Sequence, residues 1–73
     1  MDTHLVDLCS EYIEYVDASS SGMYPLEDLH QIDSQRQVTH NEILRYTHQD
    51  RSVDMYQFAR VELMKARAEG YSV

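Results

Sequence analysis

Apolar residues recur with helical spacing between residues 5 and 16, and this pattern constrains the fold more than any other feature of the sequence. The apolar positions are i, i+3, i+4, i+7, i+8 and i+11, occupied by Leu5, Leu8, Cys9, Tyr12, Ile13 and Val16. Such spacing places the side chains in one stripe along an α-helix. Asp2 or Thr3 can cap its start. We therefore predict a helix over about residues 3–16.

The next segment combines small polar residues with a possible second helix start. Residues 17–23 are rich in serine and contain Gly22, a composition typical of a flexible linker. Pro25 suits the first turn of a helix, where a missing N–H is tolerated. Leu26, Leu29 and Ile32 then supply a short apolar edge. The segment predicts a linker over residues 17–23 and a helix over about 25–33.

Two start signals for a further helix coincide near residue 39. Thr39 and Glu42 have the spacing of a capping box, in which each residue bonds to the backbone of the other. Val38 and Ile43 flank the cap with the spacing of a hydrophobic staple. These signals predict a helix over about residues 40–48.

The last predicted helix covers about residues 53–68, with Asp50 or Ser52 as its cap and Gly70 as its stop. Its main stripe consists of Tyr56, Ala59, Leu63 and Ala66, with Met55 beside it. Its other side is also apolar and carries Phe58, Val61 and Met64. A helix that is apolar on both sides is either central to its own fold or docked on another molecule. We expect the central position.

These segments predict one domain over residues 1–73, an all-α compact bundle of three to four short helices. Within this class, helices 25–33 and 40–48 form a candidate helix-turn-helix, which would expose His40, Asn41, Arg45 and His48 for reading DNA. The connection between them is longer than usual and lacks glycine. Duplex binding also requires neutralised phosphates, and the chain has a net charge of −7. A packing role for these helices is therefore preferred.

Charge is divided unevenly along the chain. Residues 1–35 hold eight acidic residues and no Lys or Arg, whereas residues 36–73 hold five acidic and six basic residues. Such asymmetry is typical of interaction surfaces, although solubility alone also explains a high net charge. The single cysteine, the absence of a basic leader and the absence of a long apolar run predict a cytoplasmic protein.

No residue pattern in the sequence indicates catalysis or a bound cofactor. The four histidines are scattered and form no spacing typical of a metal site, so we expect no metal. Cys9 falls within the apolar stripe near carboxylates, where a thiol is a poor nucleophile. Only two glycines are present, so no phosphate-binding loop is predicted. We therefore expect a protein that is not an enzyme and needs no cofactor.

In length, acidity, start at Met1 and lack of enzyme motifs, the chain resembles the small phage-encoded inhibitors of host bacterial RNA polymerase. The resemblance covers these general properties of the whole chain and includes no diagnostic motif, so it assigns no residues. It implies binding of RNA polymerase in the host cytoplasm, inhibition of transcription initiation, and an effect on termination. The alternatives are a DNA-binding helix-turn-helix regulator and an acidic anti-restriction or antitoxin-like module that sequesters a basic enzyme.

A binding protein of this kind needs surface anchors rather than a pocket. Arginine and aromatic side chains serve well as anchors, because they bury much area and form fixed hydrogen bonds. An acidic helix can speed encounter with a basic partner. The predicted partner-binding residues are Arg36, Arg45, Arg51, Arg60, Tyr46, Phe58, Glu11 and Glu14. We expect a monomer that binds a protein and does not bind DNA specifically by itself.

Overall fold

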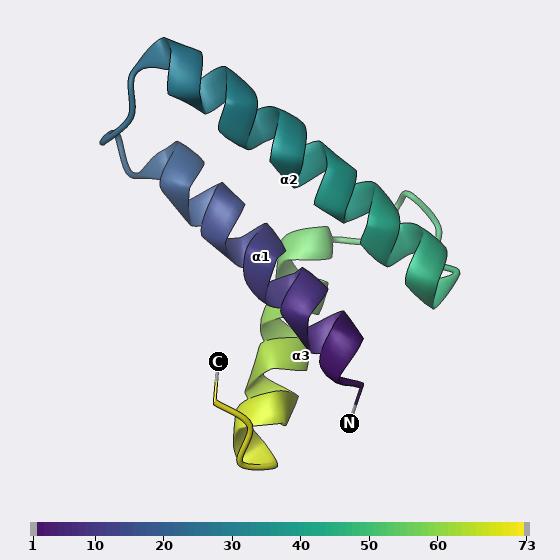
Figure 1. Ribbon diagram of the computed structural model, residues 1–73. Helices are drawn as coiled ribbons and strands as arrows, with labels where there is room; N and C mark the ends of the chain where they lie inside the picture. The colour runs from purple at the N-terminus through teal and green to yellow at the C-terminus, as the bar shows by residue number, and fades with distance from the viewer. Residues whose placement is uncertain (1, 73) are drawn as a thin grey trace.

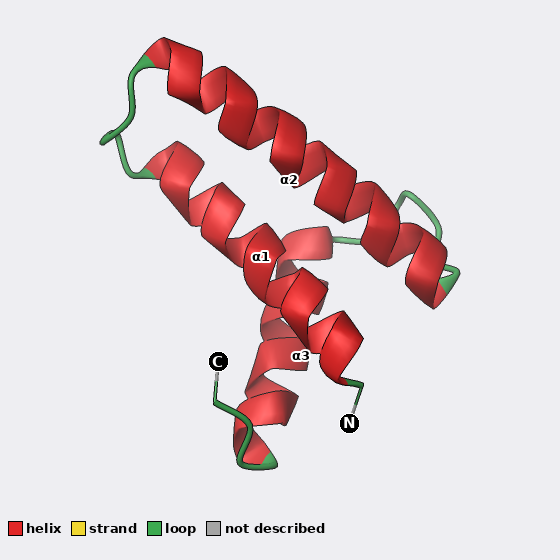
Figure 2. Cartoon of the chain, in the orientation of Figure 1, coloured by secondary structure: helices red, strands yellow, loops and turns green. Residues whose placement is uncertain are grey.

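The structure, a computed structural model, describes residues 2–72. This part of the chain forms three helices and no strand: α1 (Thr3–Ser20), α2 (Leu26–Thr47) and α3 (Met55–Ala68) (Figure 2). Helices α1 and α2 run antiparallel as a long hairpin, and α3 crosses α1 at a steep angle (Figure 1). The predicted all-α class is confirmed.

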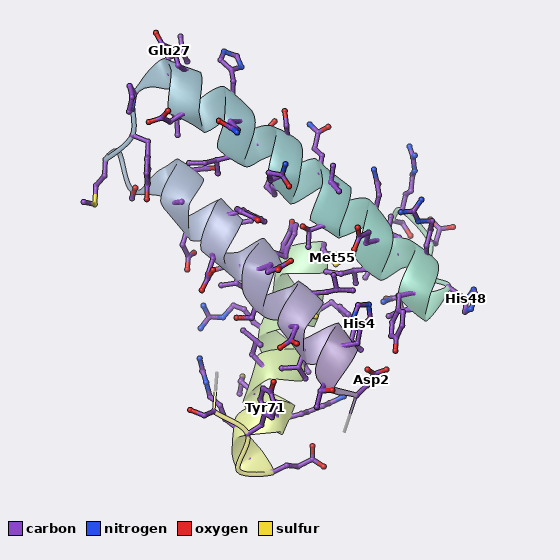
Figure 3. All side chains as sticks on the ribbon, viewed as in Figure 1. Asp2, His4, Glu27, His48, Met55 and Tyr71 are labelled. Atoms are coloured by element: carbon purple, nitrogen blue, oxygen red, sulfur yellow. The ribbon has the colours of Figure 1, made fainter. Side chains whose placement is uncertain are left out.

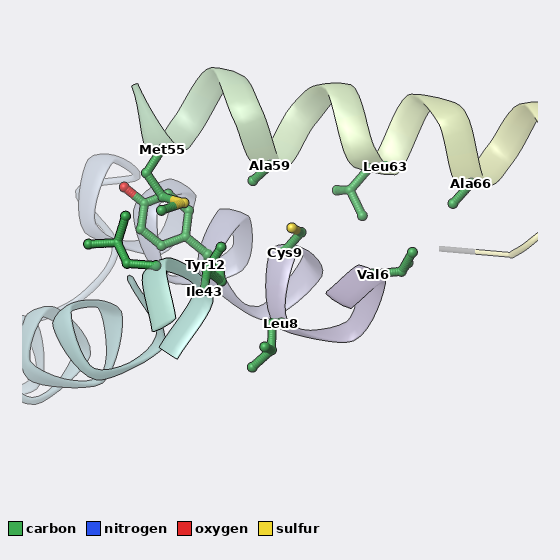
Figure 4. Packing of buried hydrophobic residues seen from close by; sticks show 10 residues of the cluster. Val6, Leu8, Cys9, Tyr12, Ile43, Met55, Ala59, Leu63 and Ala66 are labelled. Atoms are coloured by element: carbon green, nitrogen blue, oxygen red, sulfur yellow. The ribbon is translucent and has the colours of Figure 1, made fainter. Parts of the chain in front are cut away.

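Helix α1 is the central helix, because it packs against both α2 and α3. It therefore buries a broad face, with Val6 on it as well as the predicted Leu8, Cys9 and Tyr12. The small side chain of Ala59 faces Cys9 across the α1–α3 contact (Figure 4). Close approach of the two helices follows from this small residue.

The expectation that the last helix is central is wrong. Helix α3 buries one stripe, which consists of Met55, Ala59, Leu63 and Ala66. Met55 thus takes the buried place predicted for Tyr56, which is half-buried at the rim. On the other side Val61 and Met64 remain 40% and 63% exposed. Within residues 2–72 only α1 packs broadly against α3, so one stripe is enough to hold it.

The linker predicted over residues 17–23 is wrong in its first half, because α1 continues to Ser20. The hydroxyl groups of Ser19 and Ser20 donate to the carbonyl oxygens of Tyr15 and Val16, at 3.0 and 3.1 Å. A serine can bond back in this way to the carbonyl four residues earlier, so a short serine run fits the end of a helix. The connection between α1 and α2 is only residues 21–25.

The two helices predicted over 25–33 and 40–48 are one continuous helix, α2. Thr39 is 5% exposed in its interior, so the predicted capping box at Thr39 is not formed. Val38 is 51% exposed and makes no staple. The residues between the predicted helices contain neither Gly nor Pro, and Arg36 and Gln37 both bond to Asp33 one turn away.

Continuity of α2 also rules out the predicted helix-turn-helix at residues 25–48, since no turn separates its two parts. Helix α2 ends instead at His48, a non-glycine residue in the left-handed region with φ 55°. The N–H of Gln49 donates to the carbonyl of Leu44 at 3.1 Å, which closes the helix end.

The ends of the other helices agree better with the sequence. Asp2 caps α1 by accepting from the N–H of Leu5 at 3.1 Å. Helix α3 is capped by Asp54, rather than by Asp50 or Ser52. Gly70, with φ 89°, follows its end as predicted.

Candidate protein-binding surface

One side of the C-terminal half of α2 and the loop after it form a polar, basic surface. Asn41, Leu44 and His48 lie on one side of the helix because they are spaced by three or four residues. Two adjoining open depressions, of about 680 and 380 Å³, share Asn41, Leu44 and Arg51. We call this surface the basic face and define it by Arg36, His40, Asn41, Arg45, His48 and Arg51.

Loop residues 48–54 bring Arg51 back against α2. The side chain of Asp50 accepts from the N–H of Ser52 at 2.8 Å, which forms a tight turn around Arg51. This bond lowers the pKa of Asp50. Arg51 therefore lines both depressions, although it lies outside every helix.

Arg45 and Arg51 carry uncompensated positive charge. Within residues 2–72, neither forms an ion pair with a carboxylate. Glu42 borders Arg45 in a neighbouring depression without pairing with it. By contrast Arg36 donates from Nε and Nη2 to Asp33 Oδ1 at 2.9 and 2.8 Å, and this bonding raises the pKa of Arg36. The free positive charge of the basic face therefore belongs mainly to Arg45 and Arg51.

His40 is half-buried near two of the arginines of the basic face. Burial lowers the pKa of His40, and the charges of Arg36 and Arg51 lower it further. The imidazole also meets the ring of Tyr12 edge-on, with centroids 5.8 Å apart. Since the ordinary pKa of histidine is about 6.5, His40 is neutral at neutral pH and serves the face as a hydrogen-bonding group.

The structure separates Arg60 from the other predicted arginines. Arg60 lies on α3, where its guanidinium carbon is 5.7 Å from the centroid of the Tyr56 ring. Its Nη1 donates to the hydroxyl of Tyr56 at 3.2 Å, and that hydroxyl donates to Asp17 at 3.3 Å. Arg60 thus belongs to the contact between α1 and α3.

The predicted aromatic anchors also have partners within the chain. The hydroxyl of Tyr46 donates to Asp2 at 2.6 Å, and its ring meets that of His4 with centroids 4.9 Å apart. This bond ties the start of α1 to the end of α2, where Figure 3 shows Asp2, His4 and His48 (Figure 3). Phe58 is half-buried against the core.

Glu11 and Glu14 are exposed on α1, as the sequence predicts for the side opposite the apolar stripe. Neither forms an ion pair within the described part of the chain. They lie on α1, whereas the basic face lies on α2 and the loop after it. The acidic and basic residues that are separated in the sequence therefore also occupy different parts of the surface.

The predicted burial of Cys9 is confirmed, since its side chain is 0% exposed. Burial, with the nearby charge of Glu62 adding to it, raises the pKa of Cys9 to about 12. The group is a thiol at neutral pH and packs as a small apolar side chain. Among residues 2–72 no three His, Cys, Asp or Glu residues gather as metal ligands would.

Asn41 and His48, which were named from the sequence only as candidates for reading DNA, both line the larger depression. Both lie with Leu44 on the helix predicted over residues 40–48, so their spacing along one side of it was already visible in the sequence. None of the helices in the described chain has the length and apolar character needed to cross a membrane.

The chain matches no family model, no curated protein and no solved structure. A bundle of three helices supports many unrelated functions, so the fold alone assigns none. The chemistry of the surface therefore has to carry the functional assignment.

Proposed function

We propose that the protein is a non-enzymatic regulator of transcription that binds a host protein through the basic face. The preferred partner is bacterial RNA polymerase, and the proposed effect is inhibition of transcription initiation. The observation that carries the proposal is the presence of Arg45 and Arg51, both without a carboxylate partner among residues 2–72, on one face of an acidic protein.

The shape of the basic face supports a macromolecular partner. Its depressions are open and polar rather than enclosed and apolar, whereas small-molecule sites enclose most of their ligand. Arg45 lies in the last turn of a capped helix, which fixes its backbone. An arginine on a fixed backbone loses less conformational freedom when it pairs with a carboxylate.

Charge favours a protein over duplex DNA as the partner. Affinity for DNA comes largely from contacts with phosphates, and a net charge of −7 opposes it. A protein surface with a local group of carboxylates can pair with Arg45 and Arg51. The exposed acids Glu11 and Glu14 lie on α1, a different helix from the basic face. The choice of RNA polymerase rests on the resemblance in length and acidity to phage-encoded inhibitors, whereas the surface supports an acidic protein site.

The test is transcription in vitro by bacterial RNA polymerase holoenzyme, with the wild type and an Arg45→Ala/Arg51→Ala double variant. We expect the wild type to inhibit and the double variant to need about 30-fold more protein, which corresponds to the loss of about 2 kcal/mol at an anchor. Melting temperatures of the two should agree within a few degrees, because both side chains are exposed.

Arg67→Ala is the matched control, because Arg67 is also an exposed arginine but lies in the last turn of α3. It should inhibit as the wild type does. If the wild type leaves transcript yield unchanged at every concentration, polymerase is not the partner. If all three proteins inhibit equally, the contact is made elsewhere. Retention of a duplex DNA of defined sequence by the protein alone would instead favour a DNA-binding regulator.

A further inference from the structure

The second surface of interest is the free end of the α1–α2 hairpin, which we call the hairpin end and define as residues 14–35. The last buried residue of α1 is Tyr12 and the first of α2 is Thr39, so none of residues 13–38 is buried. In Figure 1 the hairpin extends well beyond α3 at this end. Its contact with α3 lies at the edge nearest the core, where Asp17 accepts a hydrogen bond from the hydroxyl of Tyr56.

The turn of the hairpin end exposes large apolar side chains. Met23, Tyr24 and Leu26 are 83%, 45% and 69% exposed, all within four consecutive residues. A short connection between helices needs only turn residues, which here are Gly22 and Pro25. Single exposed apolar residues are ordinary, but a contiguous group marks an interaction site.

A groove continues from this turn along the two helices. It is an open depression of about 300 Å³, lined by Tyr15 of α1, by Tyr24, and by Ile32 of α2. Its remaining lining consists of Asp28, Gln31 and Gln35. The groove therefore has aromatic and aliphatic sides with polar groups around them, which is the composition of a site for an amphipathic segment.

Charge at the hairpin end is of one sign. Glu14, Glu27 and Asp28 are exposed and form no ion pair within residues 2–72, and Glu27 lies at the extreme end of α2 in Figure 3. Residues 1–35 contain no Lys or Arg, and the next base, Arg36, is already bonded to Asp33. An occupant of the groove therefore meets apolar groups surrounded by unneutralised carboxylates.

We propose that the hairpin end is a docking site for a basic amphipathic helix of a partner protein. Its apolar side chains pack on Tyr15, Tyr24 and Ile32, while its lysines or arginines meet the surrounding carboxylates. Two antiparallel helices with an open groove between them accept a third helix readily, as in helical bundles. This site is independent of the basic face and of the function proposed for it.

A second copy of the chain is a poorer occupant. A symmetric dimer places the same surface of one copy on that of the other, so it would bring one surface that carries Glu14, Glu27 and Asp28 against a second such surface. Like charges brought together across an interface oppose binding. Charge complementarity thus selects a basic partner.

The test uses a synthetic helical peptide of about 18 residues, built from leucine and lysine with leucines at i, i+3, i+4 and i+7. A second peptide has the same composition in scrambled order. Both are titrated into the full-length protein labelled with ¹⁵N, and affinity and amide shifts are measured. We expect the amphipathic peptide to bind about tenfold more tightly than the scrambled one, with the largest shifts in residues 14–35.

Variants separate the groove from general attraction between opposite charges. Tyr24→Ala/Leu26→Ala should weaken binding of the amphipathic peptide about tenfold, since it removes apolar contact area. Val61→Ala/Met64→Ala is the matched control, because it removes exposed apolar side chains from α3, and it should leave binding unchanged. Glu27→Lys/Asp28→Lys should weaken binding about tenfold. Because both residues lie in the first turn of α2, where acidic side chains interact favourably with the helix dipole, this variant should also melt several degrees lower.

Three results would overturn the proposal. Equal affinity for the two peptides would show attraction by charge alone. Largest shifts outside residues 14–35 would place the site elsewhere. Dimerisation of the free protein in sedimentation, abolished by Tyr24→Ala/Leu26→Ala, would identify a second copy of the chain as the occupant.

Discussion

The two ends of the α1–α2 hairpin have the same secondary structure but different support. At one end, which we call the packed end, residues 2–12 and 39–47 pack together with α3 and form the core. At the hairpin end no residue is buried, and the exposed apolar side chains lie near the turn. The packed end and the loop after it carry the basic face apart from Arg36, and the hairpin end carries unpaired acids.

This difference separates stability from surface chemistry. Burial of apolar area is the main source of stability in a domain of this size, so the packed end holds the fold. Substitutions at the hairpin end should therefore change the free energy of unfolding little, so its residues can vary to suit a binding partner. The basic face lies directly over the core, because Leu44, which lines both of its depressions, is 8% exposed and belongs to the core.

The sharpest contrast is expected between two isoleucines of α2. Ile43 at the packed end is 0% exposed, so Ile43→Ala should reduce the free energy of unfolding by about 4 kcal/mol. Ile32 at the hairpin end is only half-buried, so Ile32→Ala should cost about 1 kcal/mol. Urea unfolding followed by circular dichroism measures both. Equal losses would mean that the two ends are equally packed.

Continuity of α2 between the two ends gives the next largest effect. Gln37→Pro removes a helical N–H and clashes with the preceding turn, so it should cost about 3 kcal/mol and reduce helix content. Gln37→Ala is the control and should cost less than about 0.5 kcal/mol, since Gln37 is exposed. A proline that costs no more than alanine would show that residues 34–39 are a connection between two helices.

The contrast between the ends also explains what the sequence could predict. The stripe of residues 5–16 identified α1 because a core lies along it on two sides, from α2 and from α3. The first half of α2 has only a short apolar edge, because α1 lies beside it there without burying any of its residues. Without a repeating apolar pattern through residues 33–39, Thr39 and Glu42 were read as the start of a new helix. In the structure both lie inside α2, where no helix start exists for a capping box to stabilise.

The binding residues could be chosen by type but not grouped. Arg45 and Arg51 were identified as arginines in an acidic chain, yet their proximity depends on the turn at Asp50 and on the end of α2 at His48. Arg60 contacts Tyr56 instead, and the i, i+4 spacing of the two residues on the predicted helix 53–68 was a signal for this contact that was not used. The groove at the hairpin end was missed because a flexible linker over residues 17–23 left the position of Tyr15 relative to Ile32 undefined.

The smallest expected effect concerns pH and the packed end. The pKa of His40 is lowered in the folded protein, so the unfolded chain binds the proton more readily. Stability should therefore fall as the pH drops below about 6.5, the ordinary pKa of histidine, until it passes the folded pKa. His40→Gln should flatten this slope between about pH 7 and 5, measured by urea unfolding. An unchanged slope would assign the effect to another group.

The central claim is that the basic face at the packed end contacts the partner. The most direct measurement is amide hydrogen exchange of the protein, free and saturated with bacterial RNA polymerase, followed by mass spectrometry. Loop residues 48–54 are suited to it, because they lie outside the helices and Arg51 is among them. We expect the amides of residues 48–54 to exchange more slowly in the complex than in the free protein. Unchanged exchange in this loop, with slowing confined to other segments, would contradict it.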